Sequence, residues 1–324
     1  MSSLQPLRVV LYGDGRWAAD TLQRLARGSH RVVGVVLRSR PSDSALMEVA
    51  RKLGIRVAQP DRVNAPETLA MLAEWAPDLG ISIAYDQILG GTAIRLPRLG
   101  TLNLHAGQLP RYRGRNVINW AILNGETEIG LTLHYMDEGI DTGDIILQRA
   151  LPIGWTDGYA EVLDRVVAAC PDLVAEGIRL VANGAAERRP QPSADATYFG
   201  GRSDGDEWLD WNDTSTNLYN KIRAISRPGP GARTLLGADL IVVWRATYDP
   251  GWPHYLANVG QVVGRRPDGV VVKTGDSTLW LHEVQVGDGD PMVPDWPVGT
   301  RLGVNSLALL HRLAQSAAVP GVLA

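Results

Sequence analysis

The sequence predicts an α/β fold with a doubly wound, mainly parallel β-sheet, followed by a smaller antiparallel β-barrel. The sheet is predicted because short apolar runs rich in β-branched residues alternate with segments of helical period over residues 7–184. The barrel is predicted because short alternating strands and tight turns fill residues 239–286. A length of 324 residues is typical of two domains. We expect these domains to be residues 1–204 and 205–324.

Each predicted strand of the first domain is an apolar run, and each predicted helix repeats apolar residues at helical spacing. The strands are expected at residues 7–13, 31–39, 79–85, 100–106, 129–136 and 143–153. The helices are expected at residues 16–28, 42–54, 64–78, 116–125 and 157–184. Gly28 and Gly54 are candidate helix stops, and Ser42 or Asp43 is a candidate cap. Pro171 is expected to kink or split the longest helix.

The second domain follows a stretch rich in Gly, Pro, Ser and charge at residues 185–207, which is typical of a linker. A helix is expected at residues 213–226. Strands are expected at residues 239–248 and within 260–286, with turns at 267–269 and 275–278. The tail from Val304 is weakly helical.

Composition limits the classes of function. The formal net charge is -3, which argues against a chain-wide electrostatic hold on nucleic acid. Cys170 is the only cysteine, so an internal disulfide and a thiolate zinc cluster are excluded. No apolar run approaches the roughly 18 residues of a membrane span, and the N-terminus is too polar for a signal peptide. We therefore expect a cytoplasmic protein with no membrane contact.

The segment Gly13–Ala18 reads GDGRWA and matches the pattern of a dinucleotide-binding turn after a strand. The next strand ends with Arg38 and Arg40 where an NAD site needs an acid, so an NADP-linked oxidoreductase stays open as an alternative. The favoured interpretation is a tight strand-to-helix turn that touches a phosphate or sugar without binding a dinucleotide.

Asn103 and His105 share one side of a strand end, because strand side chains repeat every second residue. A satisfied core histidine is the alternative interpretation, but two adjacent polar side chains are costly to bury without a purpose. Such a pair suits a carbonyl that becomes a tetrahedral oxyanion. Candidate carboxylate partners are Asp137, Glu138, Asp141 and Asp144. Calcium is not favoured for this acidic loop, because the EF-hand spacing is absent.

Residues 103–148 resemble the core of the folate-dependent formyltransferases. They contain the family's Asn-x-His, its Leu-Pro and Arg-Gly segment, and its Asp-x-Gly at Asp141. A weaker resemblance covers residues 12–22, 222–232 and 269–285. The resemblance implies a Rossmann-like formyltransferase domain and an OB-like barrel. It also implies 10-formyltetrahydrofolate as co-substrate, with no metal.

The resemblance also implies the site residues. Asn103 and protonated His105 would stabilise the oxyanion, and Asp141 would keep His105 charged and oriented and relay a proton through a water. The pterin would lie against the backbone of two loops. The implied contacts are Gln87, Ile88, Leu89, Asp137, Glu138, Gly139 and Ile140. The expected acceptor contacts are Tyr85, Gln108 and Arg113, although Gln108 departs from the Leu or Ser of many members.

The acceptor is expected to be a nucleotide-linked amino sugar, because residues 114–148 look closest to the sugar-nucleotide N-formyltransferases. Nucleic acid is not expected as a partner, and a homodimer stays open. Methionyl-tRNA and another small amine, such as an ornithine-type metabolite, remain as alternatives. Arg111, Arg113 and Arg115 read either as a solvated loop or as contacts to an anionic substrate.

Overall fold

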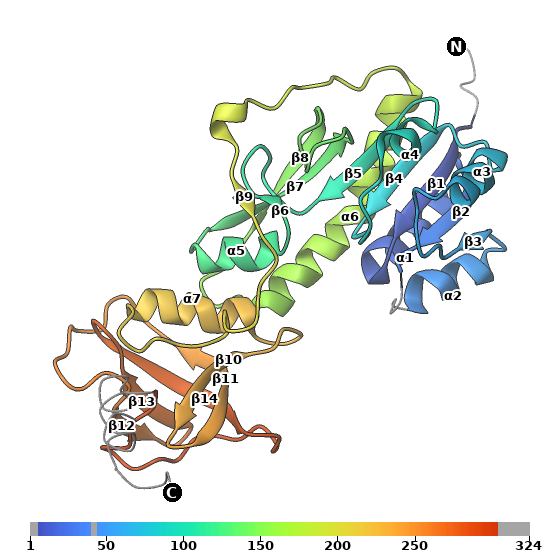
Figure 1. Cartoon of the computed structure of the whole chain (residues 1–324). Helices are drawn as coiled ribbons and strands as arrows, with labels where there is room; N and C mark the ends of the chain where they lie inside the picture. The colour runs from blue at the N-terminus through green and yellow to red at the C-terminus, as the bar shows by residue number, and fades with distance from the viewer. Residues whose placement is uncertain (1–5, 40–43, 304–324) are drawn as a thin grey trace, which may run out of the picture. The chain divides into compact units, whose positions relative to one another are not determined.

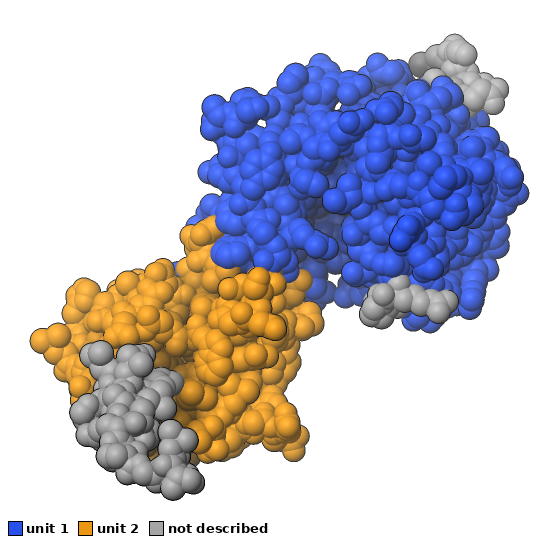
Figure 2. Space-filling view, in the orientation of Figure 1, with its two compact units in different colours: residues 1–121, 126–155, 161–201 blue, residues 122–125, 156–160, 202–324 orange. Residues whose placement is uncertain are grey.

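The structure is a computed structural model that describes residues 6–39 and 44–303. The predicted cap at Ser42 or Asp43, Arg40 and the predicted helical tail from Val304 lie outside these ranges. The chain forms two compact units (Figure 2). Unit 1 comprises Met1–Ala121, Glu126–Trp155 and Glu161–Gly201, and unit 2 comprises Ile122–Gly125, Thr156–Ala160 and Arg202–Ala324. A domain boundary after residue 204 remains a proposal.

Unit 1 is built on a seven-stranded sheet of order β3-β2-β1-β4-β5-β7-β8 (Figure 1). Its strands are β1 Arg8–Gly13, β2 Arg31–Leu37, β3 Val57–Ala58, β4 Leu79–Ile83, β5 Thr101–His105, β7 Glu128–Tyr135 and β8 Ile145–Pro152. The pairs among β1 to β5 are parallel, whereas β7 and β8 add antiparallel strands at one edge. The predicted doubly wound, mainly parallel sheet is therefore confirmed.

The α-helices described in the first part of the chain follow the predicted helices closely, with the exception of α4. They are α1 Gly15–Ala26, α2 Ser44–Lys52, α3 Pro66–Glu74, α4 Gly91–Arg95, α5 Val117–Leu123 and α6 Tyr159–Ala182. The sequence did not predict β3 and α4, because such short elements carry little periodicity. The predicted split of the longest helix at Pro171 is wrong, since α6 runs through this residue as one helix.

The turn after β1 is tight because the helix packs directly on the strand end. A Cβ at Gly13 would lie 2.6 Å from the Cβ of Ala18 and 2.8 Å from the carbonyl oxygen of Ile83. Tyr12, one residue earlier, is fully buried in an apolar cluster with Leu72 and Trp75. The close packing around Gly13 therefore explains why a glycine is needed at this position, without any ligand.

Two short strands, β6 Arg113–Gly114 and β9 Tyr198–Phe199, pair in parallel. Residue 198 lies in the segment that the sequence predicts to be a linker. This segment therefore returns to unit 1 and pairs with the loop that follows β5, which positions that loop for the site described below.

Unit 2 contains a five-stranded antiparallel sheet of order β10-β11-β14-β13-β12, and its first helix is α7 Ser215–Ile225. The strands are β10 Ala232–Leu236, β11 Asp239–Thr247, β12 Val262–Arg266, β13 Gly269–Lys273 and β14 Thr278–Val286. Leu302 pairs with Leu236 and Arg301 with Gln261. Leu236 belongs to the edge strand β10 and Gln261 directly precedes the edge strand β12, so residues 301–302 pair at both edges of the sheet, as expected of a small barrel.

Candidate active site

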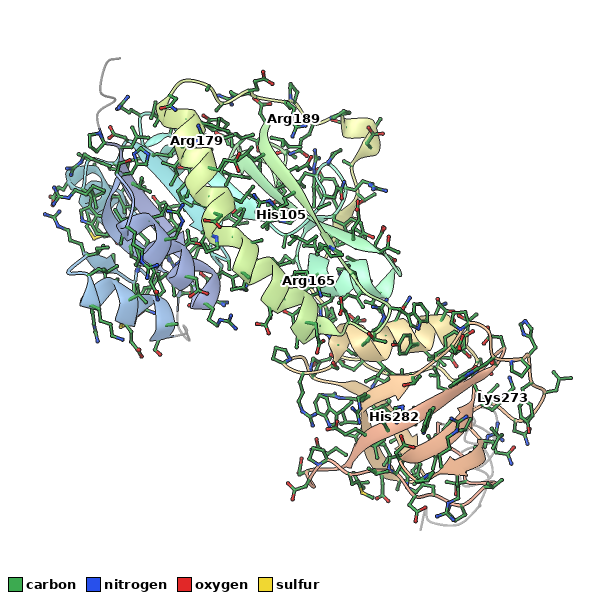
Figure 3. All side chains as sticks on the ribbon, turned by 180° about the vertical axis from the view of Figure 1, so that it is seen from behind. His105, Arg165, Arg179, Arg189, Lys273 and His282 are labelled. Carbon is green, nitrogen blue, oxygen red and sulfur yellow. The ribbon has the colours of Figure 1, made fainter. Side chains whose placement is uncertain are left out.

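Asn103 and His105 lie on the same side of β5, because they are two residues apart on one strand. His105 lies near the middle of unit 1 (Figure 3). His105 is only 7% exposed, and its Nε2 lies 2.6 Å from the carbonyl oxygen of Tyr112. Since a carbonyl only accepts, Nε2 must carry the hydrogen. The adjacent strand β7 runs antiparallel and places His134 opposite Asn103.

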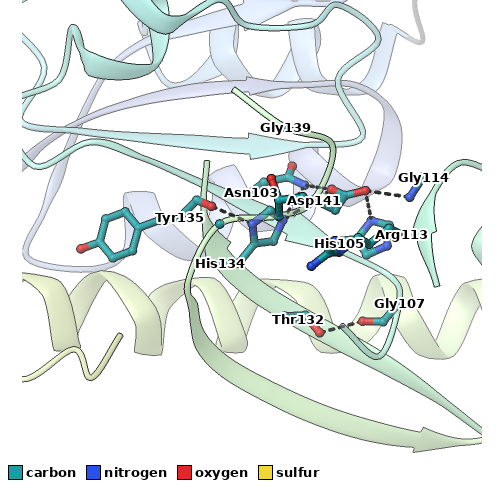
Figure 4. A network of polar contacts seen from close by, with 12 residues as sticks. Asn103, His105, Gly107, Arg113, Gly114, Thr132, His134, Tyr135, Gly139 and Asp141 are labelled. Carbon is teal, nitrogen blue, oxygen red and sulfur yellow. Dashed lines mark hydrogen bonds and ion pairs between the residues drawn. The ribbon is translucent and has the colours of Figure 1, made fainter. Parts of the chain in front are cut away.

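Asp141 joins these side chains into one network (Figure 4). Its Oδ1 lies 3.3 Å from Nδ2 of Asn103 and 3.5 Å from Nε2 of His134. Its Oδ2 accepts from the backbone N–H of Gly114 at 2.9 Å and lies 3.6 Å from Nδ1 of His105. The structure thus brings together the three side chains predicted to be catalytic, and it selects Asp141 from the four candidate carboxylates.

His134 was not predicted to belong to the site. Its Nδ1 lies 2.8 Å from the carbonyl oxygen of Tyr135, and its Nε2 lies 3.2 Å from Nδ2 of Asn103. The Tyr135 carbonyl only accepts, so Nδ1 of His134 carries a hydrogen, and the amide N–H of Asn103 faces Nε2. One signal in the sequence could have indicated His134. It is a histidine in the alternating strand predicted at residues 129–136, which follows the strand that ends in Asn-x-His.

The carboxylate of Asp141 is ionised at neutral pH. Burial by itself would raise its pKa, but the nearby side chains of His134 and His105 and the N–H of Gly114 together lower the pKa to about 2. Asn103 adds a further donor to the same carboxylate. A buried negative charge is therefore held directly beside the imidazole of His105.

His105 itself is expected to be neutral in the free enzyme. Burial lowers its pKa, and this effect outweighs the opposing influence of the Asp141 carboxylate and the Tyr112 carbonyl, while His134 lowers it further. The resemblance implies a protonated His105, whereas the lowered pKa favours a neutral ring in the free enzyme. The reason is the near-complete burial of the ring, which sequence periodicity cannot measure.

The buried histidine makes stability depend on pH. Because the folded-state pKa of His105 is below its unfolded value of 6.5, its contribution is complete above pH 6.5 and is lost as the pH falls below it. We expect the free energy of unfolding, measured by chemical denaturation, to fall between neutral pH and about pH 5. In His105→Gln this fall should be smaller. An identical fall in both proteins would show that His105 is not the group responsible.

The first predicted folate loop, residues 85–90, is held by hydrogen bonds to residues 60–64. Gln87 accepts from the backbone N–H of Val63 and donates to the carbonyl of Pro60. Asn64 donates to the carbonyl of Ile88 and accepts from the N–H of Gly90. Ile88 is 72% exposed, whereas Leu89 is buried. The side chains of Gln87 and Leu89 therefore support the loop, and Ile88 is the side chain presented to solvent.

A pocket of about 620 Å³ opens beside this loop, lined by residues 62–67 together with Gln87 and Ile88. Its volume is within the usual range for small-molecule sites. The wall includes the cation of Arg62 and apolar groups of Val63 and Ile88. The carboxylate of Glu67 also lines this pocket.

The second predicted folate loop, residues 137–141, is compact. Asp137 accepts from the N–H of Gly139 and the hydroxyl of Thr142. Glu138 forms an ion pair of 3.0 Å with Arg95 at the end of α4, and Ile140 is 47% exposed. The loop therefore presents the side chain of Ile140 to solvent.

The three predicted acceptor contacts have different partners within the protein. Tyr85 packs edge-on against Tyr12 at 5.7 Å, and burial raises its pKa. Gln108 lies against Gly130 of β7. Arg113 is buried, with its guanidinium bonded to Gln191 and to the hydroxyl of Tyr198. The guanidinium of Arg113 is therefore already engaged by side chains of the protein.

Three other arginines named in the sequence analysis differ in their exposure and in their partners: Arg111, Arg115 and Arg38. Arg111 and Arg115 are exposed, which fits both interpretations offered for them. Arg38 lies 3.2 Å from Asp14 and 3.6 Å from Asp86, so its charge is already engaged by carboxylates. This arrangement weakens the case for a 2′-phosphate there and thus for an NADP-linked oxidoreductase.

Within residues 6–39 and 44–303, no group of three or more His, Cys, Asp or Glu side chains is arranged to hold a metal ion. Over the same part of the chain, no helix has the length and apolar character needed to cross a membrane.

Comparison with known proteins gives consistent matches over most of the chain. Residues 7–176 match the family model described as "Formyl transferase", and residues 203–297 match "Formyl transferase, C-terminal domain". A methionyl-tRNA formyltransferase of Symbiobacterium thermophilum is 38% identical over 86% of this chain and 88% of that protein. Another, of Pelotomaculum thermopropionicum, is 33% identical over 86% of this chain and 91% of that protein.

Among solved structures, the N-formyltransferase from Helicobacter canadensis in complex with folinic acid and dTDP-3-aminofucose has a TM-score of 0.66. It is 19% identical and covers 85% of this chain and 99% of its own. At this identity the likeness shows a shared fold and nothing about the acceptor.

The relatives overturn two predictions from the sequence. The expectation of a nucleotide-linked amino sugar as acceptor is wrong, and so is the expectation of no nucleic-acid partner, because the relatives of 30–38% identity are methionyl-tRNA formyltransferases. The net charge of -3 misled because it sums the whole surface and says nothing about a local contact.

Proposed function

This chain belongs to the formyl transferase family and is a formyltransferase, and we propose that it transfers the formyl group of 10-formyltetrahydrofolate to the α-amino group of methionyl-tRNA. The observation that carries the choice of acceptor is the 38% identity to a methionyl-tRNA formyltransferase over 86% of this chain. The chemistry is supported by the cluster of Asn103, His105 and Asp141. We also propose a cytoplasmic location, where charged tRNA is used.

Asn103 and His105 supply N–H donors for the oxyanion. In the free enzyme these donors bond to protein acceptors: Asn103 to Asp141 and His134, and His105 to the carbonyl of Tyr112. As the amine attacks the formyl carbon, the carbonyl oxygen gains negative charge. Asn103 and His105 then turn donors toward it, which stabilises the tetrahedral intermediate in a buried, low-dielectric site.

His105 and Asp141 handle the proton that the attacking amine loses. The neutral imidazole accepts this proton on Nδ1, directly or through one water. The resulting imidazolium lies 3.6 Å from the Asp141 carboxylate, which stabilises its charge. The proton leaves with the folate nitrogen when its bond to the formyl carbon breaks. His105 therefore starts neutral and becomes the cation that the sequence-based hypothesis required.

The donor is proposed to bind at residues 85–90 and 137–141, with the pterin against the backbone and beside the exposed Ile88 and Ile140. Arg62 in the neighbouring pocket wall would attract the glutamate carboxylates of the folate. These contacts need backbone groups and apolar surface more than particular polar side chains.

The acceptor is tested by incubating the enzyme with 10-formyltetrahydrofolate and aminoacylated initiator tRNA. We expect N-formylmethionyl-tRNA as product, with a KM for the tRNA that rises by orders of magnitude between low and physiological salt, because phosphate contacts release counterions. Free methionine is the control and should not be formylated. Absence of the product, or a KM that does not respond to salt, would refute methionyl-tRNA as acceptor.

A further inference from the structure

We propose that Gln191 is a positioning residue that holds the Asp141 segment against His105. Gln191 lies in the returning segment, residues 189–199, which the sequence predicts to be part of a linker. The inference deepens the proposed function, since it rests on the role of Asp141 in formyl transfer.

The amide of Gln191 is hydrogen-bonded through both of its polar atoms. Its Nε2 donates to the carbonyl oxygens of Asp141 at 2.9 Å and Gly143 at 2.7 Å. Its Oε1 accepts from Nε of Arg113 at 3.1 Å and from Nη2 at 2.8 Å. Carbonyl groups only accept and a guanidinium only donates, so the orientation of this amide is fixed by its partners. Four directed bonds therefore connect the Asp141 segment to Arg113.

Arg113 anchors the other side of the amide. Its side chain is buried, and Nη1 donates to the hydroxyl of Tyr198 at 2.7 Å. The backbone N–H of Arg113 also donates to the carbonyl of Thr197 at 2.9 Å. The next residue, Gly114, donates its N–H to Oδ2 of Asp141. The returning segment thus fixes both the backbone of Asp141 and one of the donors to its carboxylate.

Asp141 needs this support because its backbone is in the left-handed region, with φ of 55°. A non-glycine residue there is held only when its surroundings over-determine the conformation. The Gln191 bond to the Asp141 carbonyl acts directly on this strained residue. Without that bond, the carboxylate would no longer be held at its position beside Nδ1 of His105.

The test compares Gln191→Leu and Gln191→Glu with the parent. Leu removes all four bonds at similar volume, whereas Glu keeps the acceptor for Arg113 and loses the two N–H donors to the backbone. We expect kcat to fall by on the order of 10²-fold in both, as for a misplaced catalytic group. Gln285→Glu is the matched control, because Gln285 also accepts from a side-chain N–H and donates to a backbone carbonyl, but in the barrel. It should keep the parental kcat.

A second readout follows the imidazole of His105 by NMR titration, with its signal assigned by comparison with His105→Gln. The charged or titratable groups that face this ring are Asp141, which raises its pKa, and His134, which lowers it. Displacing Asp141 in Gln191→Leu should therefore lower the pKa of His105, an effect that a purely structural role elsewhere would not produce.

The two readouts separate the inference from the proposed function. A lowered His105 pKa in Gln191→Leu supports positioning even if no protein forms N-formylmethionyl-tRNA, in which case only the proposed acceptor fails. A folded Gln191→Leu with the parental His105 pKa overturns the inference. If Gln191→Leu does not fold, parental activity in Gln191→Glu overturns it, and the expected loss of kcat supports it.

Discussion

His105→Gln is expected to reduce formyl transfer by on the order of 10³-fold or more, because one residue supplies both an oxyanion donor and the proton acceptor. Glutamine keeps an N–H donor of similar reach but has no basic nitrogen. Binding of a folate analogue, measured by calorimetry, should be nearly unchanged, since the proposed donor contacts are in residues 85–90 and 137–141. The expected result is therefore a loss in kcat with an intact donor site.

The control for this substitution is His254→Gln, which changes an exposed histidine of the second unit. It should leave transfer unchanged. Near-parental turnover in His105→Gln would refute both roles given to His105. A large loss of folate affinity in the same variant would instead place His105 in donor binding.

Asp141→Asn is expected to lower kcat by on the order of 10²-fold or more. The substitution keeps the shape, and asparagine tolerates the left-handed backbone that this position adopts at φ of 55°. It removes the charge that stabilises the imidazolium formed during transfer. Since the carboxylate raises the pKa of His105, the acid limb of the kcat/KM profile should also move to lower pH in the variant.

Asp144→Asn provides a control from the same loop. Asp144 pairs with Arg188 at 2.9 Å and makes no contact with His105 among the interactions of the described residues. Its loss should change kcat by only a few fold. If Asp141→Asn has the parental rate at every pH, Asp141 has no part in charge stabilisation or proton transfer.

Some residues of this site could be predicted from the sequence, whereas others could not. Asn103 and His105 could be paired from sequence because both belong to one strand, where a period of two places alternate side chains on one side. The choice of Asp141 among four nearby carboxylates came only from resemblance, because its contact with Asn103 spans 38 positions. His134 was not predicted because the pairing of β7 with β5 cannot be deduced from the sequence of either strand alone.

The sequence by itself determined the alternation of strands and helices, the parallel sheet and the location of Asn103 and His105, because local periodicity depends on neighbouring residues. Only the tertiary structure decided that Arg113 is buried, that Gln191 reaches back 50 positions to Asp141, and that burial lowers the pKa of His105. These properties depend on desolvation and on contacts between distant segments. Burial and long-range contacts arise when the chain folds back on itself, so a local pattern of residues in the sequence cannot predict them.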